Sequence, residues 1–156
     1  MHYSMNPKDK YPADYPELAD EILDHFGRIC HSLGIIWYLS AGTCLGFYRE
    51  GTYIEGDNDI DIRIIGDNGT LDILFEAIQK EGFIPSPHPN FRRVHFRKSN
   101  ILLDIKKVHG EIPHLAVIFH NKQPYRIPYY TEDYLTRLYG PDWGTPQQML
   151  LRSHRD

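Results

Sequence analysis

The sequence feature that most limits the fold is an alternation of aspartate and isoleucine in residues 57–64. Asp57, Asp59 and Asp61 stand at every second position, and isoleucines fill the positions between and after the last two acids. Successive side chains of a β-strand point to opposite faces of a sheet. The pattern therefore predicts a strand over residues 58–65 with one acidic face and one apolar, core-facing side.

Acids gathered on one face repel one another unless a cation lies among them. Clustered carboxylates form a hard-oxygen site that suits Mg²⁺ or Mn²⁺, so we predict that Asp59 and Asp61 bind a divalent metal. A solvated strand face is the plain alternative. An EF-hand loop starting at Asp57 is excluded, because such a loop needs Gly at its sixth position and Glu at its twelfth. Ile62 and Asn68 stand there instead.

A run of small residues precedes the acids. It follows an apolar strand predicted over residues 35–39 and reads Ser40-Ala41-Gly42-Thr43. We predict a turn here and a short helix beginning near Thr43, whose first N–H groups would face a bound anion. Glycine lets a backbone approach a phosphate closely, so Gly42 and Thr43 are candidate phosphate contacts.

A further acid, Asp104, stands in an otherwise apolar strand predicted over residues 101–108. A buried acid is costly unless it is paired. One interpretation is a salt bridge to a nearby Arg or Lys. The other places this strand beside the acidic strand, so that Asp59, Asp61 and Asp104 converge and hold metal ions for a phosphoryl displacement.

The remaining pattern alternates helices and strands. Helices are predicted over residues 16–33, from a Thr70 cap to Gly82, and from a Thr131 cap to Gly140. Residues 91–97 and 101–108 are predicted to form a hairpin, and residues 114–120 a strand. Residues 85–90 are predicted to form a loop, and residues 123–130 are predicted to be irregular. The segment after residue 142 is predicted to add one short helix.

This order predicts an α/β (α+β) domain with a mixed β-sheet and helices packed on it, rather than a doubly wound sheet. Residues 1–15 lack periodicity and are interpreted as an N-terminal arm, and residues 16–156 as one compact domain. The formal charge of −4 argues against nucleic-acid binding. No apolar run is long enough for a membrane span, and no signal peptide is recognised. Cys30 and Cys44 lie in apolar patterns, which favours two reduced core thiols over a disulfide. We therefore expect a cytoplasmic protein.

Several motifs together resemble the LicD/fukutin family of the polymerase-beta-like nucleotidyltransferase superfamily. They are Ser40-Ala41-Gly42-Thr43, Leu45-Gly46, Arg49, Asp57-x-Asp59-Ile60-Asp61-Ile62, Asp104-Ile105, Pro128, Tyr134-Leu135 and Tyr139-Gly140-Pro141-Asp142-Trp143. The resemblance implies a nucleotidyltransferase fold and transfer of a phospho-alcohol unit, such as phosphocholine or a polyol phosphate, from a CDP-linked donor to a glycan hydroxyl.

By position, the resemblance implies that Asp59, Asp61 and Asp104 are catalytic and bind Mg²⁺ or Mn²⁺, and that Arg49 reaches the diphosphate. An ordinary surface position for Arg49 stays open. Two other functions stay open as well: transfer of an NMP to a small molecule, and a non-catalytic nucleotide-binding module. The basic residues of the predicted hairpin are either solvated or a wall for an anionic substrate. Likewise, Tyr125, Tyr129 and Tyr130 either pack at the surface or stack on a base or sugar.

Overall fold

The computed structural model describes residues 13–87 and 92–146, which form a mixed α/β structure. The helices are α1 (Tyr15–Leu33), α2 (Ala41–Glu50), α3 (Asn68–Lys80) and α4 (Thr131–Tyr139). The strands are β1 (Ile36–Leu39), β2 (Asp59–Ile65), β3 (Phe83–Pro85), β4 (Arg93–Phe96), β5 (Leu102–Lys107), β6 (Leu115–His120) and β7 (Gln123–Pro128). Within these residues, no helix is long and apolar enough to cross a bilayer.

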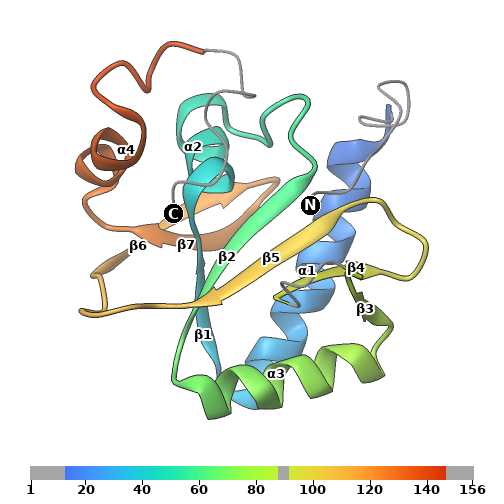
Figure 1. Cartoon of the computed structure of the whole chain (residues 1–156). Helices are drawn as coiled ribbons and strands as arrows, with labels where there is room; N and C mark the ends of the chain where they lie inside the picture. Colours follow the sequence, from blue (N-terminus) through green and yellow to red (C-terminus); the bar gives the residue numbers. More distant parts are fainter. Residues whose placement is uncertain (1–12, 88–91, 147–156) are drawn as a thin grey trace.

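Five strands form one mixed sheet in the order β1-β2-β5-β4-β3 (Figure 1). Strands β2 and β5 are parallel, and the other neighbours are antiparallel. Parallel neighbours need a crossover connection, which here contains α3 and the short strands β3 and β4. The predictions of a mixed sheet, of the β4–β5 hairpin and of β5 beside the acidic strand are confirmed.

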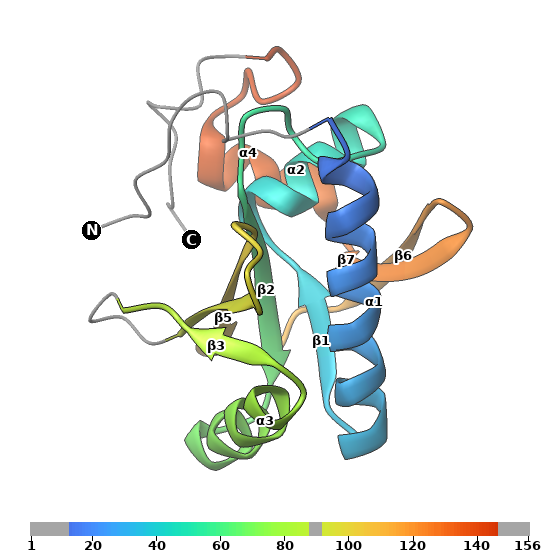
Figure 2. The same ribbon diagram turned by 90° about the vertical axis from the view of Figure 1, so that its right-hand side faces the viewer.

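The apolar face of this sheet forms the core. Ile60, Ile62 and Ile64 are at most 1% exposed, as the alternating pattern predicts, and Leu103 and Ile105 lie opposite two of them on β5. Helix α1 runs along the sheet, and α3 lies at its lower end (Figure 2). The helices contribute apolar side chains at helical spacing to the same cluster: Ala19, Ile22, Leu23, Phe26, Cys30, Leu71, Leu74 and Ile78.

Helix α1 begins at Tyr15, with Pro16 in its first turn, and ends at Gly34, which has a left-handed φ of 71°. These signals made the helix predictable to within a residue. The predicted arm falls largely on residues 1–12, which lie outside the described residues. Its last residue, Tyr15, is buried against Tyr53.

Strands β6 and β7 form a separate two-stranded sheet, and this corrects the prediction that residues 123–130 are irregular. The turn residues Asn121 and Lys122 have φ values of 49° and 67°. Two left-handed residues in succession make the tight turn that suits a hairpin. Pro124 and Pro128 had argued against a strand, but a two-stranded sheet consists only of edges, where proline is tolerated.

Two helix starts also differ from the prediction. Helix α2 begins at Ala41 with Ser40 as its N-cap, so the small residues form its first turn and not a separate one. In α3 the N-cap is Asp67, whose carboxylate accepts the backbone N–H of Thr70 at 2.9 Å. This bond holds the pKa of Asp67 below its usual value. The short helix predicted after residue 142 falls mostly on residues 147–156, outside the described part.

Candidate active site

The three predicted carboxylates lie on the polar face of the sheet. Asp59 and Asp61 share one face of β2, and Asp61 is the register partner of Asp104 on β5. Residues paired across parallel strands point to the same side, so the three carboxylates occupy one area of the sheet. All three residues are at most 8% exposed. The structure therefore brings together Asp59, Asp61 and Asp104 in a largely buried position.

Arg93 lies among these acids. Its Nη2 atom is 3.3 Å from Oδ2 of Asp104 and 3.6 Å from Oδ2 of Asp59, and its Nε donates to Asp104 Oδ2 at 3.3 Å. Arg93 is the register partner of Asp104 on the antiparallel side. The salt bridge considered for Asp104 thus exists, together with the convergence of the acids. Sequence reasoning noted Arg93 only as one of several basic hairpin residues.

Asp57 is a fourth acid at this place. A Cβ atom built on Gly42 would lie 2.9 Å from Oδ2 of Asp57 and 3.3 Å from Oδ2 of Asp61. Asp57 Oδ1 accepts the backbone N–H of Asp59 at 3.2 Å, which orients its carboxylate. We refer to Asp57, Asp59, Asp61 and Asp104 as the acid cluster. Glycine at position 42 leaves room for two of its carboxylates beside the first turn of α2.

Thr43 joins the first turn of α2 to the acidic strand. Its Oγ1 accepts the backbone N–H of Asp61 at 2.8 Å, and the carbonyl of Asp61 accepts the N–H of Ser40 at 3.0 Å. Thr43 therefore holds Asp61 in register with the helix start. A hydroxyl that accepts one hydrogen bond can still donate its proton, so this position is compatible with the predicted phosphate contact.

The start of α2 is also held by α4. Ala41 has a left-handed φ of 42°, which is unfavourable for a residue with a Cβ, and its N–H donates to the Tyr134 hydroxyl at 2.7 Å. The Tyr139 hydroxyl lies 4.0 Å from the Cβ built on Gly42. Strained backbone of this kind is found preferentially at functional sites. Two tyrosines of α4 thus border the helix terminus that the acid cluster faces.

The contacts of Arg49 within the described part of the chain are with Glu50 and Trp143 and not with the acid cluster. Its Nη2 lies 2.6 Å from Glu50 Oε2, and its Nη1 donates to the Trp143 carbonyl at 2.9 Å. Trp143 packs on the Tyr48 ring and donates from Nε1 to Thr136. These contacts support a structural role for Arg49 in fixing the segment after α4. Its proposed contact with a diphosphate stays a prediction.

The acid cluster fits a divalent cation by its chemistry. Oδ1 of Asp104 is buried and accepts no hydrogen bond, which makes it available as a cation ligand. All the donor atoms are carboxylate oxygens, the ligands that Mg²⁺ and Mn²⁺ prefer. In residues 13–87 and 92–146, no three His, Cys, Asp or Glu side chains are arranged closely enough to form a ready metal-ligand group.

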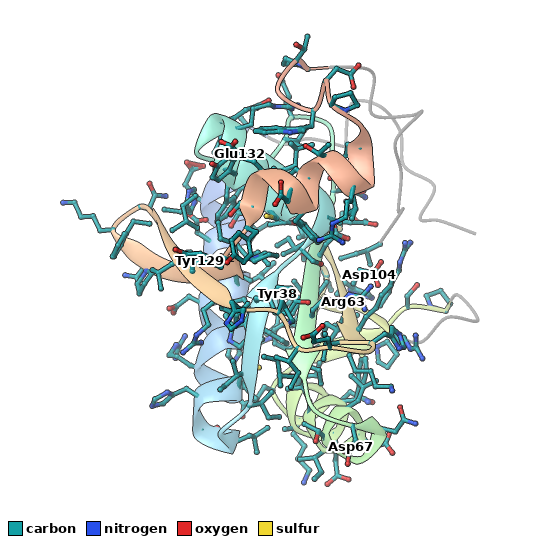
Figure 3. The ribbon with its side chains drawn as sticks, turned by 90° about the vertical axis from the view of Figure 1, so that its left-hand side faces the viewer. Tyr38, Arg63, Asp67, Asp104, Tyr129 and Glu132 are labelled. Carbon is teal, nitrogen blue, oxygen red and sulfur yellow. The ribbon has the colours of Figure 1, made fainter. Side chains whose placement is uncertain are left out.

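A groove of about 510 Å³ is lined in part by Arg63, which lies two residues after Asp61 on β2. Its walls include two arginines and four tyrosines: Arg63, Arg137, Tyr38, Tyr129, Tyr130 and Tyr134. Figure 3 shows Tyr38 and Arg63 between Tyr129 on one side and Asp104 on the other, below α4. We refer to this depression as the tyrosine groove.

Together these features define a mixed α/β protein whose sheet carries a buried acid cluster at the start of a helix. Comparison with known proteins finds curated relatives that are similar to part of this chain. The chain is 33% identical over 104 residues to ribitol-5-phosphate transferase FKTN of Macaca fascicularis and 34% identical over 104 residues to that of Mus musculus. Each match covers 62% of this chain and 22% of the relative.

The corresponding protein of Homo sapiens is 36% identical over 70 residues, which are 45% of this chain and 15% of the relative. The matches thus span about a fifth of the length of these curated relatives. No protein-family model matches the chain. The chain is therefore similar over part of its length to a ribitol-5-phosphate transferase.

Proposed function

We propose that this chain is a metal-dependent transferase of the LicD/fukutin type, built on a nucleotidyltransferase fold. It moves a phospho-alcohol unit, such as ribitol phosphate or phosphocholine, from a CDP-linked donor to a glycan hydroxyl. The observation that carries the proposal is the pairing of buried Asp61 with buried Asp104 across parallel strands, on the face that also holds Asp59. The partial similarity to the FKTN proteins supports the same class of reaction.

The first turn of α2 would bind the donor phosphates. Backbone N–H groups at a helix start attract anions, and Gly42 leaves room beside this turn for the carboxylates of Asp57 and Asp61, whose metal would face the donor phosphate. Thr43 fixes the distance between this turn and Asp61 through its 2.8 Å hydrogen bond. The chain would thereby hold the donor with its phosphate next to the acid cluster.

The reaction is an exchange of two P–O bonds. The acceptor hydroxyl attacks the phosphorus that carries the alcohol, a new P–O bond forms, and the bond to the CMP oxygen breaks. The hydroxyl proton would pass to a carboxylate oxygen of the acid cluster that does not hold the metal. Mg²⁺ or Mn²⁺ held by Asp59, Asp61 and Asp104 would neutralise charge on the phosphoryl oxygens and on the leaving group.

The test is transfer from CDP-ribitol to an oligosaccharide acceptor in the presence of Mg²⁺, followed by measurement of released CMP. We expect Asp61→Asn to lower the rate by at least about a hundredfold, because electrostatic stabilisation of the transition state is lost. The matched control is Asp72→Asn, which changes an exposed acid on α3 and should leave the rate unchanged. Unfolding midpoints of both variants establish that they are folded.

Two results would contradict the proposal. One is full activity of a folded Asp61→Asn variant. The other is release of pyrophosphate from CTP, with CMP attached to the acceptor, because that product identifies nucleotidyl transfer instead of phospho-alcohol transfer.

A further inference from the structure

We propose that the tyrosine groove binds the nucleoside diphosphate part of the donor, with the base on the tyrosines and the phosphates extending past Arg63 towards the acid cluster. This inference rests on the proposed function and deepens it, because it assigns the nucleoside diphosphate of the donor to one surface of the protein.

Two lining residues of the groove, Arg63 and Tyr134, lead towards the acid cluster, whose own residues do not line the groove. Arg63 lines the groove and lies two residues after Asp61 on the same face of β2. Residues two apart in a strand are separated by about 6.6 Å, a span comparable with the length of a diphosphate. Tyr134 lines the groove as well, and its hydroxyl accepts the N–H of Ala41 at the start of α2. A ligand in the groove would extend past Arg63 and Tyr134 towards the proposed phosphate site.

The charged side chains that line the groove are Arg63, Arg137 and Glu111, two cations and one anion, so the lining carries a net positive charge that suits an anion. Arg63 stands at the end next to the acids, where its Nη1 donates to the Lys107 carbonyl and fixes the guanidinium. Arg137 lies on the exposed side of α4 and lines the same groove. A guanidinium carries five donors in a planar fork that matches phosphate oxygens. A diphosphate placed here would lie between Arg63 and a cation held by the acid cluster.

The aromatic lining suits a planar ring. Tyr129 and Tyr130 are 58% and 64% exposed, and their rings meet edge to face at a centroid distance of 4.9 Å. The backbone N–H of Tyr129 donates to the His114 carbonyl at 2.7 Å, which fixes this segment at the mouth of the groove. Large exposed aromatic rings beside arginines are typical of surfaces on which bases stack.

The test measures binding of CDP to the full chain by calorimetry, with and without Mg²⁺. We expect Tyr129→Ala to weaken binding of both CDP and cytidine by about tenfold, since loss of one base–aromatic stack costs that much. Arg137→Ala should weaken CDP but leave cytidine unchanged, because cytidine has no phosphate. The matched controls are Phe119→Ala and Arg126→Ala, which change an exposed aromatic residue and an exposed arginine on the β6–β7 hairpin away from the groove.

Asp61→Asn separates this inference from the proposed function. The variant should be inactive in transfer and still bind CDP within about twofold of the wild type in the absence of metal, because the groove is unchanged. If the wild type transfers the phospho-alcohol and Tyr129→Ala and Arg137→Ala both bind CDP normally, the groove assignment is wrong and the function stands. Weakened binding of an acceptor glycan instead of CDP would also overturn the assignment. A wild type that binds none of CDP, UDP, ADP or GDP would remove the function as well.

Discussion

Arg93 and Asp104 face each other across strands β4 and β5, with the Nη2 atom 3.3 Å from Oδ2 of the carboxylate. The side chain of Asp104 is 2% exposed and that of Arg93 12%, so the carboxylate is buried and the guanidinium is partly buried. Since Nη2 also lies 3.6 Å from Asp59, one guanidinium neutralises part of the acid cluster. The protein thus carries an internal cation at the place where the proposed reaction needs a divalent one.

We predict that Arg93→Gln destabilises the metal-free protein by about 3 kcal/mol, because it leaves Asp59 and Asp104 as buried charges without their partner. Saturating Mn²⁺ should restore much of this loss, since the metal then supplies the missing positive charge. Mn²⁺ should also bind this variant more tightly than the wild type. Urea unfolding with and without Mn²⁺ and calorimetric titration measure both effects.

The control for this experiment is Arg126→Gln, which removes an exposed arginine from β7 and should change neither stability nor Mn²⁺ affinity. Equal Mn²⁺ affinity in the wild type and in Arg93→Gln would show that the guanidinium and the metal do not share the same carboxylates.

Gly42→Ala provides a test of the space around the acid cluster. The new Cβ would lie 2.9 Å from Asp57 Oδ2 and 3.3 Å from Asp61 Oδ2, so at least one carboxylate must move. Alanine favours a helix by about 1 kcal/mol over glycine, which offsets the cost of that movement. We therefore expect stability within about 1 kcal/mol of the wild type and a loss of Mn²⁺ binding and transfer.

Gly69→Ala is the matched control, because Gly69 lies in the first turn of α3 and its Cβ would meet only a cap oxygen at 3.3 Å. This variant should retain full activity. A fully active Gly42→Ala variant would mean that the first turn of α2 does not require the space found there.

A second polar cluster, around His120, should contribute to the stability of the fold. Oδ1 of Asp20 accepts the Tyr53 hydroxyl at 2.6 Å and His120 Nε2 at 2.8 Å, and His120 Nδ1 lies 3.0 Å from the Gly51 carbonyl. The imidazole also stacks on Phe47, with a centroid distance of 4.4 Å. Because His120 joins the end of β6 to α1 and to the end of α2, His120→Ala should lower the free energy of unfolding by about 2–4 kcal/mol.

Urea unfolding measures this loss. His109→Ala, at an exposed position, is the control and should change stability by less than about 0.5 kcal/mol. A change of similar size in both variants would show that the contacts of His120 contribute little.

From the raised pKa of the buried Cys30 thiol, we predict that the protein loses stability at alkaline pH. Burial raises its pKa from 9.0 to about 12, so the folded thiol keeps its proton while the unfolded thiol ionises. The corresponding stability is complete below the unfolded pKa and is lost as pH rises towards 12, by up to about 1.4 kcal/mol per pH unit. Tyr125, whose pKa is raised to about 12 by burial, adds to this loss. Unfolding free energies of the wild type and Cys30→Ala at increasing pH should converge above about pH 9.

The fold was predictable wherever local periodicity decides the structure. Isoleucines at every second position predicted that β2 faces the core. Apolar residues at helical spacing, followed by a terminal glycine, predicted α1. Strand β7 was missed because its prolines are unfavourable in most sheets, and the decisive signal is the left-handed pair Asn121-Lys122 in the preceding turn. That conformation depends on the hairpin as a whole and not on the residues alone.

The candidate site was predictable in part, because the same alternation of residues along a strand also places the acids. Alternation placed Asp59 and Asp61 on one face, and an acid in an apolar strand drew attention to Asp104. Arg93 could not be distinguished from other hairpin basic residues, because only the register between β4 and β5 sets it opposite Asp104. The tyrosine groove combines residues from β1, β2, the β5–β6 and β7–α4 connections and α4, so no sequence window contains it.

The parallel pairing of β2 with β5 has a consequence for how the protein acquires its site. These strands meet only after the intervening crossover has closed a long loop, which is entropically costly and slows folding in proteins of high contact order. Helix α1 and the β6–β7 hairpin depend on local contacts instead. During refolding from urea, we therefore expect helical signal to appear before the four aspartates assemble, so that the proposed affinity for divalent ions would report completion of the native topology.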